Sequence, residues 1–187
     1  SIYPDAEESI AYFKRKAISM EEVTIFRPGA RVELMIDHRN IAEAEMLVYR
    51  VDLMTLYLME KNRSRITEVD LAGIKPELVK TIRLSSTRSF LDLPSEVRLA
   101  VSEEGAYLVI CRGDDLFTSS LVLLTTLDLE VQEDAVSGRV RVNVIDRVAD
   151  ERPVGVHVKV IGSGDGIFRS GDTDLRGLYV ADGVRGL

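Results

Sequence analysis

The feature that most constrains this fold is a two-residue alternation of apolar and polar side chains, which recurs along the chain from residue 30 onward. Residues 31–37 place three aliphatic side chains between polar ones, and residues 138–146 repeat the pattern with valines. Successive side chains of a β-strand point to opposite faces, so the alternation indicates half-buried strands. The strands that we expect cover residues 30–37, 46–52, 78–85, 95–101, 105–113, 118–129, 138–146 and 153–162. Short strands separated by turn residues about every ten positions predict an all-β fold of antiparallel sandwiches.

The clearest strand is residues 105–113, which is bounded by two glycines and contains the single cysteine of the chain. Tyr107, Val109 and Cys111 share one face of this strand, and we expect that face to lie in the core. A single cysteine forms no disulfide within the chain, and no partner stands at the spacing of a metal site. Because a free cysteine packs as a small hydrophobic side chain, we interpret Cys111 as a buried core residue.

Two helices are expected beside the strands. The first covers Pro4–Ser19, because proline and acidic residues suit its first turn and the basic residues at 14–16 suit its end. Its apolar stripe, at spacings of three and four, consists of Ile10, Phe13 and Ala17. We expect this stripe to pack on a neighbouring part of the same protein. The second helix covers Leu53–Glu60, where Asp52 stands as an N-cap before a run of helix-forming residues.

The change of period near residue 20 and a new set of strands after residue 130 divide the chain. We expect an N-terminal helix at 1–20, a β-sandwich at 21–129 and a second β-sandwich at 130–187. A typical sandwich has roughly 100 residues, so we expect the second one to be incomplete.

Composition and charge argue against several classes of function. The chain of 187 residues is 45% hydrophobic and 29% charged, which is typical of a folded globular protein. Its net charge of −7 argues against binding to a nucleic-acid backbone or to an anionic membrane surface, since both need an excess of Lys and Arg. No apolar run approaches the roughly 20 residues that a membrane-spanning helix needs.

The histidines and the glycine-rich segment do not form a recognised site. His38 lies beside a turn and His157 on the polar face of a strand, so there is no HxH or HExxH pair for zinc. Residues 162–166, GSGDG, resemble a phosphate loop, but such a loop must lead into a helix and strand-like residues follow here. We interpret this segment as a hairpin turn.

Residues 171–177, GDTDLRG, resemble the start of a calcium loop. Asp172, Asp174 and Gly177 match its first, third and sixth positions. Arg176 occupies the fifth position, where its positive charge opposes a cation, and a glycine stands at the twelfth position where a glutamate belongs. We interpret the segment as a tight turn in which the side chains of Thr173 and Asp174 bond to local backbone amides and Gly177 adopts positive φ.

The remaining motifs are short. Residues 112–114 spell Arg-Gly-Asp, the integrin-binding tripeptide, and residues 62–64 form a glycosylation sequon, but three-residue matches often arise by chance. Glu21–Glu22 and Glu103–Glu104 stand in loop-like segments and are interpreted as solvated charge. No GxSxG elbow and no paired nucleophile and base are present. We therefore expect no enzyme, no cofactor, and no catalytic, cofactor-binding or metal-binding residue.

Three stretches resemble bacterial alpha-2-macroglobulin-like proteins. Residues 26–58 are similar to the opening of a macroglobulin-type domain, with Pro-Gly before a strand, an Arg-Asn turn and a YRVD strand. Residues 103–131 look like the closing strand pair of that domain, with a GAYLV entry. Residues 138–180 look like the start of the next domain, with the Pro153-Val154 strand and the turn at 171–177. These last motifs also occur in other extracellular sandwiches, such as carboxypeptidase-regulatory-like modules.

The resemblance implies macroglobulin-like or immunoglobulin-like sandwich modules from the N-terminal part of a parent that is periplasmic, bound to the cell envelope or secreted, and that traps proteases through a bait region. The family's thioester motif, Cys-x-Glu-Gln, is absent, because residues 112–114 follow Cys111, and no bait region is recognisable. The modules would be non-catalytic scaffold. Their partners would be neighbouring domains and, through the parent, proteases, with no nucleic acid and no small-molecule substrate.

Two alternatives stay open at this point. The chain is also compatible with an adhesion or ligand-binding module of an unrelated cell-surface protein, which an exposed aromatic platform would favour. With no Trp and 6% aromatic residues, such a platform is not evident. A regulatory sandwich attached to an enzyme is the other alternative.

Overall fold

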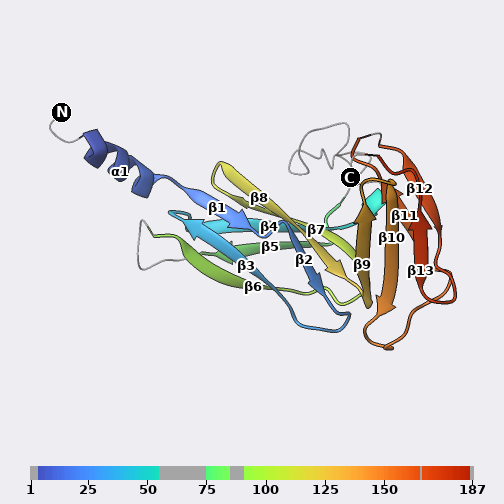
Figure 1. Cartoon of the computed structure of the whole chain (residues 1–187). Helices are drawn as coiled ribbons and strands as arrows, with labels where there is room; N and C mark the ends of the chain where they lie inside the picture. Colours follow the sequence, from blue (N-terminus) through green and yellow to red (C-terminus); the bar gives the residue numbers. More distant parts are fainter. Residues whose placement is uncertain (1–3, 55–74, 85–90, 165, 186–187) are drawn as a thin grey trace. The chain divides into compact units, whose positions relative to one another are not determined.

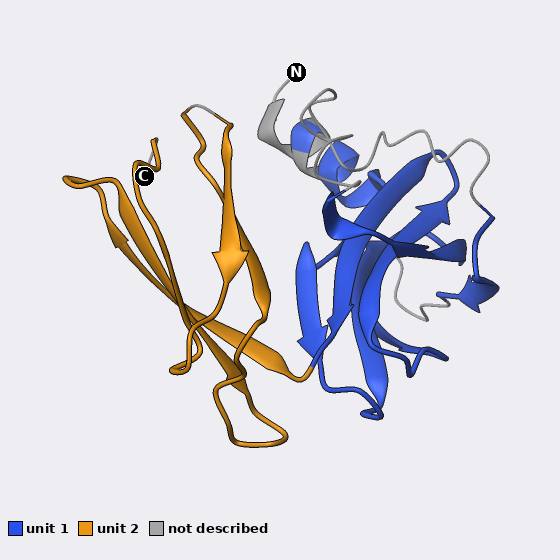
Figure 2. Cartoon of the chain, turned by 90° about the vertical axis from the view of Figure 1, so that its right-hand side faces the viewer, with its two compact units in different colours: residues 1–125 blue, residues 126–187 orange. Residues whose placement is uncertain are grey.

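The computed structural model describes residues 4–54, 75–84, 91–164 and 166–185. These residues form mostly strands, with a helix at the start of the chain (Figure 1). The chain divides into two compact units, Ser1–Thr125 and Thr126–Leu187 (Figure 2). The all-β fold expected from the alternation is confirmed. The helix expected at Leu53–Glu60 lies mostly outside the described residues.

The described part of the first unit forms one helix and eight strands. They are α1 (Pro4–Lys14), β1 (Ala17–Met20), β2 (Val23–Phe26), β3 (Val32–Arg39), β4 (Glu43–Val51), β5 (Leu78–Arg83), β6 (Leu93–Leu99), β7 (Gly105–Gly113) and β8 (Leu116–Leu124). One sheet has the order β1-β3-β6 and the other the order β2-β8-β7-β4-β5. Neighbouring strands are antiparallel except β2 and β8, which run parallel.

The core of the first unit lies between its two sheets and follows the predicted alternation. Its buried residues include Val32, Leu34 and Ile36 of β3 and Tyr107, Val109 and Cys111 of β7. Burying one such aliphatic or aromatic side chain contributes roughly 1.5–3 kcal/mol, so these strands account for much of the stability of the unit.

The five-stranded sheet is also apolar on its second face, which we call the outer face. Buried residues of the outer face are Leu47, Tyr49, Leu108 and Ile110. Uninterrupted apolar runs such as residues 106–111 are typical of strands buried on both faces. Toward the edge strand β2, the same face becomes exposed at Val23 and Ile25, which pair with positions 121 and 123 of β8.

The N-terminal helix is shorter than the sequence predicted. α1 ends at Lys14, and residues 17–19, which the expected helix included, instead form β1 together with Met20 by pairing with Ile36–Arg39. This ladder satisfies their backbone groups, and the tertiary pairing outweighs a weak helix preference. At the end of α1 the Asn40 side chain donates a hydrogen bond to the Phe13 carbonyl at 2.8 Å. It thereby satisfies a carbonyl that a helix terminus leaves without a partner.

The second unit consists of two small sheets. Its strands are β9 (Leu127–Asp134), β10 (Arg139–Asp146), β11 (His157–Ile161), β12 (Phe168–Asp172) and β13 (Leu178–Ala181). One sheet has the order β13-β10-β9, and β11 pairs with β12 in the other. The core of this unit is formed by Val140, Val142, Val144, Val158, Ala181 and Val184.

Two strands around this unit differ from the sequence prediction. The expected strand 118–129 breaks at Thr125 and Thr126, and Leu127 begins β9, which pairs with β10 instead. The expected strand 153–162 begins only at His157. Gly155, with φ of +76°, interrupts the extended backbone before it, because positive φ is incompatible with a regular strand.

Candidate functional site

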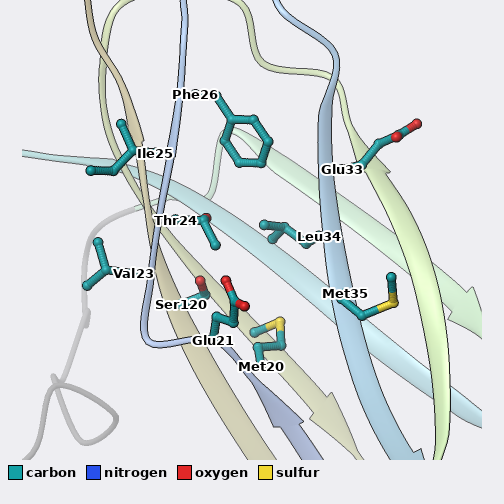
Figure 3. A pocket seen from close by; sticks show the side chains of 10 residues that line it. All are labelled: Met20, Glu21, Val23, Thr24, Ile25, Phe26, Glu33, Leu34, Met35 and Ser120. Atoms are coloured by element: carbon teal, nitrogen blue, oxygen red, sulfur yellow. The ribbon is translucent and has the colours of Figure 1, made fainter. Parts of the chain in front are cut away.

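A pocket opens at one side of the first unit, between β2 and β3 (Figure 3). We call it the edge pocket, and its volume is about 360 Å³. Its lining includes Met20, Thr24, Phe26, Leu34 and Ser120, together with the exposed Glu21. Figure 3 shows Thr24 and Phe26 pointing into the space between the two strands, while their strand neighbours at 23 and 25 point away. This alternation is the one that an extended strand imposes.

The edge pocket forms because the chain switches from one sheet to the other. β1 pairs with β3 as far as Met20, which lies opposite Ile36. After Glu21–Glu22 the chain crosses over, and β2 pairs with Leu121–Leu124 of β8. Residues 32–35 of β3 therefore pair with β6 on one side, and no described strand pairs with them on the other.

Two buried hydroxyl groups line the edge pocket without a hydrogen-bond partner among the described residues: Thr24 Oγ1 and Ser120 Oγ. A buried polar group left unsatisfied costs about 1–3 kcal/mol, and the large majority of such groups in native proteins have a partner. Glu33 also lines the pocket and has a buried oxygen, but its carboxylate is paired with Arg31. The two hydroxyls are therefore the groups that a ligand would satisfy.

The lining of the edge pocket combines two hydroxyl groups with apolar side chains and carboxylates. Among the described residues that line it there is no Cys, His, Lys or Arg, and the ionisable side chains are the carboxylates of Glu21 and Glu33. Met20, Phe26 and Leu34 surround the hydroxyls with apolar surface. Glu21 adds a negative charge. The arrangement fits an uncharged polar group between the sheets and a positive group near Glu21.

Cys111 lies in the core of the first unit and does not line the edge pocket. It is fully buried, as the strand alternation predicted. Burial raises the pKa of its thiol to about 11. Since the thiolate is the reactive form, a thiol with so high a pKa is a poor nucleophile at neutral pH.

The two histidines lie in different units, and each has a partner. His38 is buried, and its Nε2 lies 2.9 Å from Ser95 Oγ. Desolvation lowers the pKa of His38, while the charge of Asp37 acts in the opposite sense. His157 is exposed, and its Nδ1 lies 2.8 Å from Asp172 Oδ1. Within the described ranges, no group of three His, Cys, Asp or Glu residues is arranged to hold a metal ion.

The calcium-like segment is a turn whose carboxylates are already engaged. Asp174 Oδ1 accepts hydrogen bonds from the amides of Arg176, at 2.8 Å, and Leu178, at 3.0 Å. Its Oδ2 accepts a 2.7 Å hydrogen bond from the Arg176 guanidinium. This side-chain hydrogen bond, followed by the two amides, lowers the pKa of Asp174. Gly177, at φ of +68°, and Asp174 have the tight-turn structure that the sequence predicted. The prediction was wrong for Thr173, whose hydroxyl accepts from the distant Val156 amide at 3.0 Å and donates to the Pro153 carbonyl at 2.7 Å.

The other motifs of the sequence lie apart from the edge pocket. The Arg-Gly-Asp tripeptide reaches the turn between β7 and β8, where Asp114 is paired with Lys16 at 3.2 Å. The strands on either side of the glycine-rich segment, β11 and β12, pair as a hairpin. Glu103 is bound to Arg50 at 2.6 Å. The sequon at 62–64 lies outside the described residues.

Sequence reasoning missed the residues of the edge pocket. It interpreted Glu21–Glu22 as solvated charge and gave no role to Thr24 or Ser120. One signal was present, since Ser120 is a polar residue at an inward position of an apolar strand. The signal is weak, because the pocket forms only when β2 and β3 meet β8, which lies far from both in the sequence.

Among the residues that the structure describes, no helix has the length and apolar character that a membrane span requires.

The two-sheet architecture is a macroglobulin-type sandwich fold, although no family model and no curated protein sequence matches the chain. A fragment of native alpha-2-macroglobulin from Escherichia coli, spanning domains NIE-MG1, matches with a TM-score of 0.64 and 12% identity, over 90% of this chain and 87% of the fragment. The MG0-NIE-MG1 fragment matches with a TM-score of 0.70 and 12% identity, over 90% of this chain and 57% of the fragment.

Salmonella alpha-2-macroglobulin reacted with methylamine matches with a TM-score of 0.62 and 10% identity, over 90% of this chain. The chain spans 10% of that protein and 57% of the MG0-NIE-MG1 fragment. At sequence identities of 10% to 12%, these matches show that the fold is shared. The predicted resemblance to bacterial alpha-macroglobulins is confirmed at that level.

Proposed function

We propose that this chain supplies non-catalytic scaffold modules to a larger alpha-macroglobulin-like protein that traps proteases. The observation that carries the proposal is the match to the E. coli NIE-MG1 fragment over 90% of this chain and 87% of the fragment. A match across two consecutive domains is more specific than a match to one sandwich, which many unrelated proteins share. The parent would be periplasmic, bound to the cell envelope or secreted.

The proposal includes two modules, at about residues 21–129 and 130–187, of which the second is an incomplete sandwich. Leu129 and Val131 of β9 support this. They lie opposite Val144 and Val142 in the ladder and so share the core-facing side of the sheet, yet 61% and 51% of their respective surfaces are exposed. An apolar, core-facing position on an edge strand is suited to cover by another element of the parent.

Exposed apolar residues of the first unit support contact with neighbouring domains. Val23 and Ile25 extend the outer face to its edge, with 51% and 60% of their surfaces exposed. On α1, Ile10 and Phe13 are also exposed. An antiparallel sheet usually leaves one face polar and solvated, so an outer face this apolar favours a module that is covered on both sides.

In this proposal the chain has no catalytic, cofactor-binding or metal-binding residue, and its direct partners are the adjacent domains of the parent. Proteases would be partners only through the parent, since trapping needs a bait segment and a shell that closes. The net charge of −7 argues against a nucleic-acid partner.

The proposal is tested with trypsin-like and elastase-like proteases. The isolated chain should neither cleave a protease substrate nor inhibit either protease. The intact parent should shield a bound protease from large protein substrates while small peptide substrates are still cleaved. Stoichiometric inhibition by the isolated chain would contradict a scaffold role, and so would a parent that gives no size-dependent protection.

A pair of substitutions in the intact parent tests the role of the outer face. Ile25→Lys should reduce the size-dependent protection, because it places a charge at an apolar domain contact. Val148→Lys is the matched control, since Val148 is an exposed aliphatic residue in a turn of the second unit. If the two variants give the same size-dependent protection, the result would count against a domain contact at the outer face.

A second candidate function, an adhesion or ligand-binding module of an unrelated cell-surface protein, is favoured by the edge pocket. The complete reading frame of the parent discriminates between the two. A Cys-x-Glu-Gln sequence or a long array of macroglobulin domains supports the trapping protein, and their absence supports the ligand-binding module.

A further inference from the structure

We propose that the edge pocket is a site of β-strand addition. An extended polypeptide segment would pair antiparallel with residues 32–35 of β3, in line with β1, and would insert one uncharged polar side chain between the sheets. A basic residue flanking that segment would lie near Glu21.

The backbone of β3 supplies the first part of the argument. β1 pairs with β3 over Ile36–Arg39 and leaves at Glu21, so the ladder stops while β3 continues through residues 32–35. On this side no described strand continues the ladder. An open edge presents backbone groups that an added strand can pair with, which is the basis of peptide recognition by β-augmentation.

The inward side chain follows from strand geometry. Val32 and Leu34 face the core between the sheets, so a residue placed opposite Leu34 would point in the same direction, into the edge pocket. There it would meet the hydroxyls of Thr24 and Ser120 (Figure 3). Ser120 is almost completely buried, at 1% exposure, and its hydroxyl has no partner in the described part of the chain.

The chemistry of the pocket selects an uncharged polar side chain. Each hydroxyl can donate one hydrogen bond and accept others, so an amide or a hydroxyl matches both groups. A charged side chain would lose its hydration among Met20, Phe26 and Leu34 without an opposite charge between the sheets. Glu21 favours a basic residue beside the bound segment, because it is exposed and has no ion pair among the described residues. Glu33 is already paired with Arg31.

The probes are four acetylated and amidated heptapeptides of sequence KTVXVTK, in which X is Asn, Gln, Ser or Thr. Valine and threonine favour an extended strand, and the lysines supply the flanking charge. One control peptide carries Leu at X. A second control keeps Asn at X and is N-methylated at both valines, so that those positions cannot donate hydrogen bonds to the edge of β3.

The experiment is a titration of the full chain, labelled with nitrogen-15, followed by NMR. The polar probes should shift the NMR signals of the backbone amides of residues 32–35, together with those of Thr24 and Ser120. The Leu probe and the N-methylated probe should bind about tenfold more weakly, the loss expected for one or two hydrogen bonds. If no polar probe shifts these amides at several millimolar, the proposal is overturned. Equal binding of the Leu or the N-methylated probe would also overturn it.

Ser120→Ala is the decisive variant, and Ser119→Ala is its matched control on the same strand. Ser119 lies opposite Ile110 and so faces the outer face, away from the edge pocket. Ser120→Ala should weaken the binding of the polar probes about tenfold, because it removes a hydroxyl that the probe would bond to. The fold should stay intact, because this hydroxyl has no hydrogen-bond partner among the described residues. Ser119→Ala should leave binding unchanged. If both variants bind equally, the hydroxyl has no role in recognition and the proposal fails.

Sedimentation without peptide tests a second copy of the chain as the occupant. If a dimer forms as the protein concentration rises and shifts the NMR signals of the same β3 amides, that result would identify a second copy of the chain as the occupant and would overturn the proposal of a peptide. This inference does not rest on the scaffold function, since it depends only on the edge pocket. Its failure would leave the scaffold proposal unchanged.

Discussion

The guanidinium carbon of Arg39 lies 4.3 Å from the centroid of the Tyr12 ring. The same side chain donates a hydrogen bond to the Arg15 carbonyl at 3.0 Å and pairs with Asp92 at 3.5 Å. Arg39 itself is buried. A single buried cation on β3 thus binds an aromatic ring of α1, the backbone just after α1 and a carboxylate beside β6, and fixes the start of the chain to the sheet.

Arg39→Lys should loosen α1 and destabilise the first unit. Lysine keeps the charge but loses the planar fork that stacks on Tyr12 and reaches two acceptors at once. We expect the free energy of unfolding to fall by about 1.5–3 kcal/mol, the range for a hydrogen bond to a charged group. Urea denaturation measures this loss, and hydrogen exchange should be faster in α1.

Arg83→Lys is the control for this substitution. Arg83 is almost fully exposed, and its distance to Glu43 is 3.9 Å, so the exchange should change stability little. If Arg39→Lys lowers the free energy of unfolding no more than Arg83→Lys does, the contact with Tyr12 does not hold the helix.

Cys111 should react slowly with a thiol reagent in native buffer and rapidly in denaturant, because it is fully buried. Its folded pKa of about 11 lies above the ordinary value of 9.0. Its contribution to stability is therefore fully present below pH about 9 and is lost as the pH rises toward about 11, since the unfolded thiol ionises first. Cys111→Ala should flatten the stability profile in this window.

Cys111→Ser should lower the free energy of unfolding by about 1–3 kcal/mol, because it places a hydroxyl in the apolar core. Denaturant titration measures the change. Rapid labelling of the native wild-type protein would mean that this face of β7 is accessible and would contradict the core position.

The turn at residues 171–177 should bind no calcium tightly. Arg176 already neutralises the carboxylate of Asp174, and Asp172 is engaged by His157. Calorimetry at millimolar calcium should show no saturable heat. A micromolar isotherm that disappears in Asp174→Ala would contradict this expectation.

The same turn gives a prediction for pH. The folded pKa of Asp174 lies below the ordinary value of 3.8, so the stabilisation from its ionised form is present above about pH 4 and is lost as the pH falls through the lower, folded value. An NMR titration should show this low midpoint. Arg176→Gln should raise it, because the guanidinium hydrogen bond is the largest cause of the shift. An unchanged midpoint would assign the shift to the backbone amides alone.

Much of the fold could be predicted from the sequence, because a period-two pattern is a local consequence of strand geometry. The alternation from Val32 to Ile36 predicts which side chains face the core, and the same holds for Tyr107, Val109 and Cys111. The tight turn around Asp174 could also be predicted, because a short polar side chain followed by glycine bonds to its own backbone.

The parts that could not be predicted depend on contacts between distant segments. Ala17 continues the helical stripe of Ile10 and Phe13, and only the pairing of residues 17–20 with residues 36–39 makes them a strand. The parallel pairing of β2 with residues 121–124 has no local signal either. Together these two pairings create the edge pocket, so its hydroxyls at Thr24 and Ser120 could not be recognised from their own neighbours in sequence.

Gly177 should tolerate alanine less well than Gly183, although both have nearly the same backbone conformation, with φ of +68° and +67°. Positive φ costs an alanine about 1–2 kcal/mol at either position. At Gly177 an added Cβ would also lie 2.7 Å from Arg152 Cβ and 2.8 Å from the Val144 carbonyl oxygen, whereas at Gly183 nothing lies within 4 Å. We expect Gly177→Ala to be more destabilising by about 1–3 kcal/mol, the range for overpacking a close contact.

Hydrogen exchange at the amide of Val144, which donates to the Gly177 carbonyl at 2.8 Å, reports the effect on the second unit directly. Equal protection in the two alanine variants would show that β10 moves to accept the methyl group and that backbone conformation alone requires a glycine at this turn.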